Sequence, residues 1–191
     1  MIRYCLVAWF LIAPTTAHAI SMLKYNTNDH PKANGLSLTI EYPSTWRREE
    51  GNRTHIVQKF VLDMPSYSVM SFIQVQPTPI DGNIDQIAAE EFFGSFEELG
   101  SVSNIRSTKI ENEPAYMADV FVMQERAGMK VSSRQRYMVL LYKRRMIFLQ
   151  CGVFGLPSDM LAEFNRHVPD CNLFFNSFVL NSKWERAPSG R

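Results

Sequence analysis

Residues 35–46 read GLSLTIEYPSTW, and their pattern predicts the first element of the fold. Apolar residues alternate with polar ones in this stretch: Leu36, Leu38, Ile40 and Tyr42 with Ser37, Thr39 and Glu41. A period of two makes one side of an extended chain apolar and the other polar, which predicts a half-buried β-strand. The strand should stop at Pro43, with Trp46 in the loop that follows.

Further strands are predicted at residues 55–62, 67–76, 102–110, 115–125, 131–142 and 146–153. Residues 138–142 are apolar at every position, which is typical of a central strand covered on both faces. Lys143, Arg144 and Arg145 form the predicted tight turn of a hairpin between the last two strands. The polar residues 47–52 are predicted to form another turn.

Two segments have helical patterns. A stripe of apolar residues at helical spacing comprises Ile84, Ile87, Ala88, Phe92, Phe96 and Leu99. Asn83 and Gln86 are placed as a capping box at its start, and Gly100 should end this helix. Residues 158–179 should form one helix, or two separated at Pro169. The order of elements predicts an α+β fold, with helices packed on a mostly antiparallel sheet of six or seven strands.

Residues 1–19 have the features of a signal peptide. Arg3 is followed by an apolar run over residues 5–13, and Ala17 and Ala19 are small residues at the cleavage positions. The run is shorter than the roughly 20 residues that a membrane-spanning helix needs. We therefore expect cleavage after Ala19 and a soluble exported protein, periplasmic or secreted, without a stable membrane anchor.

The mature chain should be one domain. Residues 20–34 and 181–191 are rich in polar residues, so we predict that they are flexible and that residues 35–180 form a single domain. Once Arg3 is removed, 19 Lys and Arg residues face 19 Asp and Glu residues. A net charge near zero argues against binding to nucleic acid through the overall field of the protein. The content of 46% hydrophobic and 12% aromatic residues favours a packed globule.

The sequence carries no recognisable catalytic or cofactor motif. No Gly-rich phosphate loop follows a predicted strand, and the histidines lie in no known catalytic pattern. We therefore expect no cofactor and no enzymatic activity.

Two cysteines, Cys151 and Cys171, remain after loss of Cys5 with the signal peptide. In an oxidising compartment a pair of this kind is expected to form a disulfide, which here would join the closing helix to the sheet. The alternative is a metal site built from Cys151, His167 and Cys171. Pro169 interrupts the helix face that such a site would need, and no fourth ligand is evident.

The stretch 35–46 resembles the opening strand and Tyr-Pro-x-x-Trp turn of PsbP-like domains, the fold of the photosystem II extrinsic subunit and of a Ran-binding nucleotide release factor. Residues 174–178, Phe-Phe-Asn-Ser-Phe, resemble the closing helix of the same group. The resemblance covers roughly residues 35–180 and implies an α/β/α sandwich. It also implies an accessory, chaperone or binding role, because most members are not enzymes. The group has no common active site to transfer to this chain.

The expected function is that of a non-catalytic exported accessory protein that holds a protein partner. The candidate contacts are aromatic and basic residues of two polar segments, namely Trp46, Arg47, Arg48, Arg53, Lys143, Arg144 and Arg145. Arg134 and Arg136 would extend the basic patch of the second segment. For Trp46, the competing interpretation is an aromatic plug over the end of the sheet.

Two alternatives remain open at this stage. One is an enzyme with an unrecognised active site. The other is a carrier of a small apolar ligand, which would require a cavity lined by residues such as Phe92, Phe96 and Phe148.

Overall fold

The computed structural model describes residues 21–126, 128–156 and 159–184. The predicted signal peptide and its cleavage site, and residues 185–191 of the predicted tail, lie outside the described residues. The strands are β1 (Met22–Asn26), β2 (Thr39–Pro43), β3 (Arg47–Glu50), β4 (Ile56–Asp63), β5 (Tyr67–Pro77), β6 (Gly100–Ile110), β7 (Glu113–Arg126), β8 (Met129–Tyr142) and β9 (Arg145–Gly155). The α-helices are α1 (Gln86–Gly94) and α2 (Met160–Asn176), and the 3-10 helices are η1 (Pro31–Ala33) and η2 (Asn181–Lys183).

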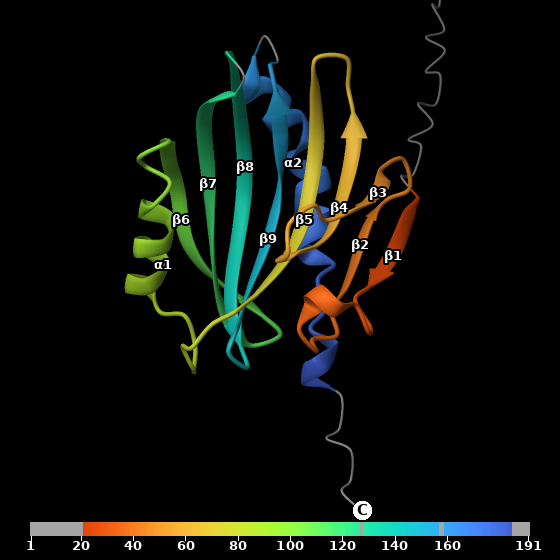
Figure 1. Ribbon diagram of the computed structural model, residues 1–191, viewed down its shortest axis with the longest axis vertical. Helices are drawn as coiled ribbons and strands as arrows, with labels where there is room; N and C mark the ends of the chain where they lie inside the picture. The colour runs from red at the N-terminus through yellow and green to blue at the C-terminus, as the bar shows by residue number, and fades with distance from the viewer. Residues whose placement is uncertain (1–20, 127, 157–158, 185–191) are drawn as a thin grey trace, which may run out of the picture.

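The main sheet has seven strands in the order β3-β4-β5-β9-β8-β7-β6, and every neighbouring pair is antiparallel (Figure 1). The predicted α+β class with an antiparallel sheet is confirmed. The opening strand does not join this sheet, however. β2 pairs with β1 in a separate two-stranded sheet, and the backbone of Thr39 bonds that of Val179 beyond α2.

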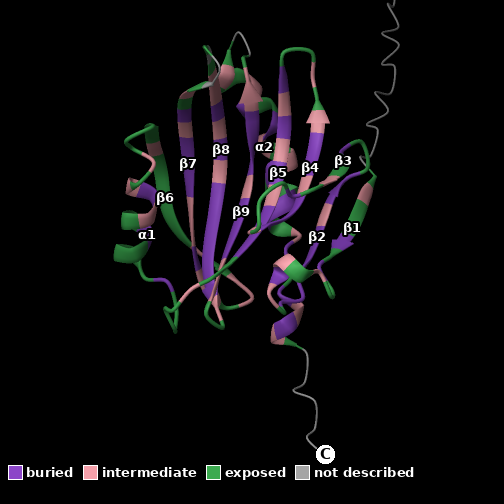
Figure 2. Cartoon of the chain, in the orientation of Figure 1, coloured by how far each residue is buried: buried purple, intermediate pink, exposed green. Residues whose placement is uncertain are grey.

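The two α-helices lie on opposite faces of the main sheet. α2 packs on β5, β9 and β8 and passes behind them in Figure 1, whereas α1 packs on β6 and β7. Alternate side chains of β8 enter two separate cores. Met138 and Leu140 join the core under α2, and Val139 and Leu141 join the core under α1. The predicted central strand covered on both faces is therefore confirmed at residues 138–142, and Figure 2 shows β8 mostly buried while the edge strand β6 is mostly exposed.

α2 is one continuous helix. The Asp159 side chain caps it by accepting a hydrogen bond from the backbone N–H of Ala162. Phe164, Phe174 and Phe175 are buried along the face that meets the sheet. Pro169 lies inside the helix without dividing it, since this face stays packed on both sides of the proline.

α1 differs from its prediction. Its N-cap is Asp85, whose side chain accepts from the backbone N–H of Ala88, so the predicted capping box is wrong. The buried residues are Ala89 and Phe93, while Ile87 is 76% exposed. The predicted stripe assumed one helix up to residue 99. The helix ends at Gly94, so the pattern spans both a helix and the turns after it.

Three polar segments are more ordered than predicted. Residues 20–34 were expected to be flexible, but Tyr25 and Ala33 belong to the core under α2. The predicted tail begins with η2, where the buried Ser182 accepts a hydrogen bond from the backbone N–H of Ser37. Residues 47–50 form edge strand β3 rather than a turn. Backbone pairing and buried aromatic rings order these segments despite their polar composition.

None of the described helices has the length and apolar character that crossing a membrane requires.

Candidate functional site

A trough lies on the face of the main sheet that α1 covers only in part. α1 is nine residues long and packs on β6 and β7, so no described helix stands over β4, β5 and β9 on that face. The trough has a volume of about 640 Å³ and is open to solvent. Its floor is formed by β4, β5, β9, β8 and β7, its walls by residues 92–99 and by the loop between β3 and β4.

Strand register orders the floor into rows, because every second residue of a strand points to the same face. Phe72 of β5 lies opposite Gln150 of β9, which lies opposite Tyr137 of β8. The next row contains Met70, Gly152 and Gln135. The third contains Ser68, Phe154 and Ser133. The floor therefore mixes aromatic rings with amide and hydroxyl groups.

Aromatic rings form the wall next to α1. The Phe92 ring stacks on that of Phe148 with centroids 5.1 Å apart and meets the Phe96 ring at 5.6 Å. The Phe96 ring in turn lies 5.1 Å from the ring of Tyr137. These are the rings that an apolar-ligand cavity would have needed. These rings contact one another and fill the space between α1 and the sheet. They therefore form one wall of the open trough and do not enclose a cavity.

The residues that line the trough include no aspartate or glutamate. Its cationic side chains are Arg53 and Lys59, and Lys59 forms an ion pair with Glu49 of β3. Arg53 is exposed and its side chain has no hydrogen-bond or ion-pair partner among the described residues. Burial raises the pKa of Tyr137 strongly, against a smaller opposing effect of Gln135, so this phenol stays protonated near neutral pH.

The predicted contact residues of the first segment, residues 46–53, have different surroundings in the structure. Trp46 is only 4% exposed and belongs to the core under α2, so it cannot be a surface contact. Its large apolar ring packs in the core because it directly follows β2, the strand held against α2. Arg47 is engaged by Glu49 and Asp63. The Arg48 guanidinium lies 5.5 Å from the centre of the Tyr25 ring, on the α2 side of the sheet.

Two of the three residues of the basic turn donate hydrogen bonds to neighbouring segments. Lys143 donates to the Ser182 carbonyl at 3.4 Å, and Arg145 donates to the Asn34 carbonyl at 3.2 Å. Arg144 is exposed. This turn and the loop that carries Arg53 meet the same end of β5: the carbonyl of His55 bonds the N–H of Val75, and Arg145 lies opposite Pro77.

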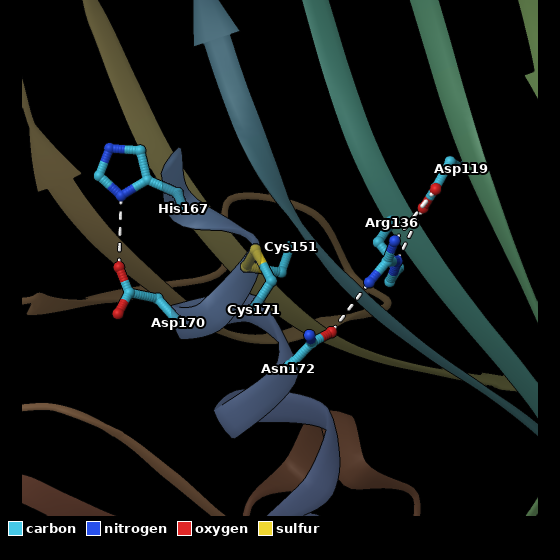
Figure 3. Close-up of a disulfide and its surroundings, with 7 residues drawn as sticks. All are labelled: Asp119, Arg136, Cys151, His167, Asp170, Cys171 and Asn172. Atoms are coloured by element: carbon cyan, nitrogen blue, oxygen red, sulfur yellow. Dashed lines mark hydrogen bonds and ion pairs between the residues drawn. A yellow bond between two sulfur atoms is a disulfide. The ribbon is translucent and has the colours of Figure 1, made fainter. Parts of the chain in front are cut away.

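The disulfide between Cys151 and Cys171 is confirmed, with a Cα–Cα distance of 5.4 Å (Figure 3). Since the two sulfurs are bonded to each other, the alternative metal site is wrong. The His167 ring nitrogens lie 3.3 Å from Asp170 and 3.4 Å from the hydroxyl of Tyr67. His167 thus helps to hold α2 on β5, and it is not among the residues that line the trough.

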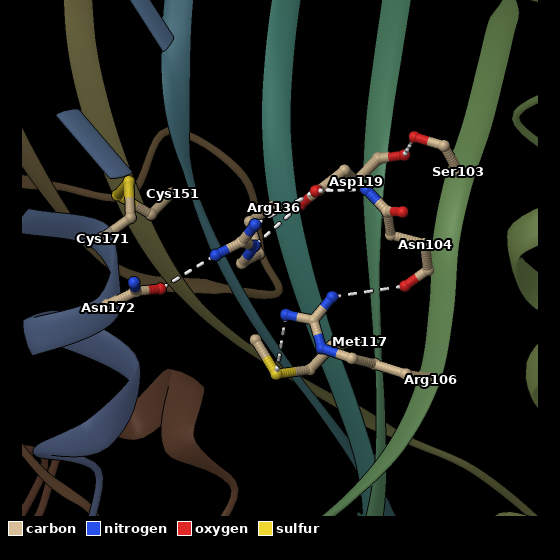
Figure 4. Close-up of polar contacts among 9 residues, drawn as sticks. All are labelled: Ser103, Asn104, Arg106, Met117, Asp119, Arg136, Cys151, Cys171 and Asn172. Atoms are coloured by element: carbon tan, nitrogen blue, oxygen red, sulfur yellow. Dashed lines mark hydrogen bonds and ion pairs between the residues drawn. A yellow bond between two sulfur atoms is a disulfide. The ribbon is translucent and has the colours of Figure 1, made fainter. Parts of the chain in front are cut away.

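The neighbouring arginines have structural contacts as well. Arg136 lies beside Cys151 in the register and pairs with Asp119 at 2.7 Å and with Asn172 of α2 at 2.9 Å (Figure 4). The Arg134 guanidinium lies 5.9 Å from the centre of the Phe164 ring. Both side chains point toward α2, so they do not extend the basic patch of the turn.

The sequence reasoning missed the trough floor. Its signal was a set of glutamines, Gln74, Gln135 and Gln150, on the same face of three neighbouring strands. A polar side chain on a face that a helix covers would be costly, so these residues mark a face that is left open. That interpretation needed the true length of α1.

No family model matches the chain, and no curated protein sequence matches it. The resemblance to PsbP-like domains stays a prediction. Among solved structures, the backbone is similar to LpqN of Mycobacterium tuberculosis, which is involved in cell envelope biogenesis: the TM-score is 0.49 at 12% identity over 83% of this chain and 90% of that one. It is also similar to PA94 of Pseudomonas aeruginosa, a protein of unknown function, with a TM-score of 0.40 at 15% identity over 80% and 92% of the two chains.

Proposed function

We propose that this is an exported, non-catalytic accessory protein that holds a protein partner in the trough on the open face of its sheet. The composition of the trough is the observation that carries the proposal. Phenylalanine, methionine and arginine are enriched where proteins meet, whereas aspartate and glutamate are depleted there. The trough presents Met70, Phe72, Phe154 and Arg53 and is lined by no carboxylate.

The other two functions have less support. A carrier of a small apolar ligand needs an enclosed cavity, but the trough is open and its Phe92, Phe96 and Phe148 rings pack on one another. An enzyme that uses acid–base chemistry needs titratable groups that converge. The trough offers His55 with no carboxylate beside it among its lining residues, and a Tyr137 phenol that burial keeps protonated.

Export rests on two independent features. One is the signal-like order of residues 1–19. The other is the disulfide, which persists in oxidising compartments and is rare in the cytosol. The resemblance of residues 35–46 and 174–178 to PsbP-like domains favours the same role, since most of that group are accessory or binding proteins.

The test is capture of the partner from the native envelope or culture fluid with tagged exported protein, whose intact mass should correspond to a chain beginning at Ile20. Phe72→Asp and Phe154→Asp each place a charge on the trough floor and should abolish capture of the partner that the wild type retains. Leu161→Asp is the matched control, because Leu161 is an exposed apolar residue of α2 on the other face. It should capture as the wild type does.

Melting temperatures of all three variants identify any that fail to fold. If folded Phe72→Asp and Phe154→Asp proteins capture the same partner at wild-type level, the trough is not the binding surface. Turnover of a substrate by the captured complex that is lost on substitution of His55 would favour an enzyme instead.

A further inference from the structure

The trough floor presents glutamine side chains from three neighbouring strands. Gln74, Gln150 and Gln135 come from three consecutive strands of the sheet, β5, β9 and β8. The backbone groups beneath them are used by the strand ladders, so only side chains are left to meet a ligand. A glutamine amide offers one acceptor and a donor NH₂ group, which complement the N–H and C=O of a peptide group.

Gln135 has an unmet acceptor. It is 5% exposed, and its Nε2 donates to the Ser133 hydroxyl at 2.8 Å. Its Oε1 has no hydrogen-bond partner among the described residues. A buried acceptor without a donor is unfavourable, and most such atoms in proteins are satisfied. A ligand that brings an N–H to this point of the floor would remove that cost once the amide turns toward it.

Gly152 lies opposite Gln135 in the register of β8 and β9. The sheet itself requires glycine here, since a Cβ would lie 2.2 Å from the carbonyl oxygen of Arg134. Gly152 also places no side chain on the floor beside Gln135, and a glycine within a strand allows another backbone to approach closely. The unmet acceptor of Gln135 thus lies beside a residue without a side chain.

The spacing of the floor matches an extended chain. Gln150, Gly152 and Phe154 follow one another at every second residue of β9, which is a repeat of about 6.7 Å. Alternate side chains of an extended peptide repeat at the same distance, whereas one turn of an α-helix advances about 5.4 Å. Phe154 is the last residue of this line, and its ring lies 5.7 Å from the ring of Phe72 on β5.

We infer that the occupant of the trough is an extended segment of the partner protein, with peptide groups held by Gln135 and Gln150 and alternate apolar side chains placed on Phe72 and Phe154. The inference rests on the proposed function. Arg53 adds charge complementarity, because it is an exposed cation without a side-chain partner in the described structure and no carboxylate lines the trough. The segment therefore carries an acidic residue toward the β3–β4 loop.

A random linear peptide library displayed on phage is the probe, selected on the intact exported protein. Enriched peptides should show apolar residues at alternating positions next to an acidic residue, and bound labelled peptide should show NMR shifts of extended backbone. Gln135→Leu and Gln150→Leu should weaken binding about tenfold or more. Gln86→Leu, the same change on α1 outside the trough, should leave it unchanged.

Gln135→Leu has a second readout that separates binding from folding. Because it removes a buried atom without a partner, it should not lower the melting temperature while it weakens peptide binding. Loss of both together would show that Gln135 is only structural and would overturn its assigned role. Arg53→Glu should weaken binding and remove its dependence on salt.

Two further outcomes contradict the inference in distinguishable ways. Trough-dependent peptides with apolar residues at helical spacing would overturn the extended segment and leave the proposed function intact. If no enriched peptide depends on the trough, while an oligosaccharide on a glycan array binds the wild type and fails to bind Phe72→Asp, both the inference and the protein-partner function are wrong.

Discussion

At the scale of single residues, the ion pair between Asp119 and Arg136 joins three strands to a helix. Their side chains are 8% and 13% exposed, and Asp119 also accepts from Asn104 of β6 while Arg136 donates to Asn172 of α2. Burial of the Asp119 carboxylate opposes its ionisation. The hydrogen bonds from Arg136 and Asn104 outweigh that effect and lower its pKa below the ordinary value of 3.8.

Asp119 should therefore stabilise the protein at neutral pH and lose this contribution in acid. Because its pKa is lower in the folded than in the unfolded protein, the contribution is full above the unfolded value and is lost as pH falls through the folded value. Asp119→Asn should cost about 3 kcal/mol at neutral pH, since it leaves the Arg136 charge unpaired, and should flatten the acid limb of the stability curve below the ordinary aspartate pKa. Urea unfolding across this pH range measures both effects. An unchanged acid limb in the variant would show that Asp119 is not the group responsible.

At the scale of elements, the disulfide reinforces the packing of α2 on the sheet. It joins Cys151 in β9 to Cys171 in α2 across a sequence separation of 20 residues, and both cysteines are fully buried. The aromatic residues of the same helix face already pack on the sheet. The bond therefore adds to an existing contact rather than replacing one.

Removal of the disulfide should destabilise the protein without changing its fold. For a loop of this length, the lost constraint on the unfolded chain corresponds to about 3 kcal/mol. The double variant Cys151→Ala, Cys171→Ala should show this loss in urea unfolding and keep the wild-type circular dichroism spectrum. The single Cys171→Ala variant should expose one thiol to labelling only after denaturation. A labelled thiol in the denatured, unreduced wild type would contradict the bond itself.

The sequence predicts elements correctly where the apolar pattern of neighbouring residues determines them. It fails where burial or strand pairing depends on segments far away in the chain. The apolar run at residues 138–142 predicted a strand covered on both faces, and the structure places its side chains in both cores. Trp46 could not be assigned from its neighbours alone, because the core that it joins also contains residues of α2, more than a hundred residues away in the chain. β3 escaped detection because charged pairs with β4, rather than apolar alternation, mark its register.

At the scale of the whole molecule, the candidate site follows from unequal covers on the two faces of one sheet. The 17-residue α2 and the β1–β2 sheet cover one face, whereas the nine-residue α1 covers one end of the other (Figure 1). The uncovered part becomes the trough. Sequence alone could predict the antiparallel sheet and both helices, but not this imbalance, because the predicted α1 was long enough to cover more of the face.

The proposed function requires the trough face, and not the α2 face, to contact the partner. Site-specific photo-crosslinking in the native envelope tests this most directly, with a photoreactive phenylalanine analogue placed at one position at a time. Phe72 and Phe154 line the trough. Phe121 of β7 is the control on the α2 face. The residues on either side of it in the strand join the core under α1, so its own side chain points to the opposite face. Adducts to one partner are expected from positions 72 and 154, and none from position 121. Adducts from position 121, with none from positions 72 and 154, would contradict it.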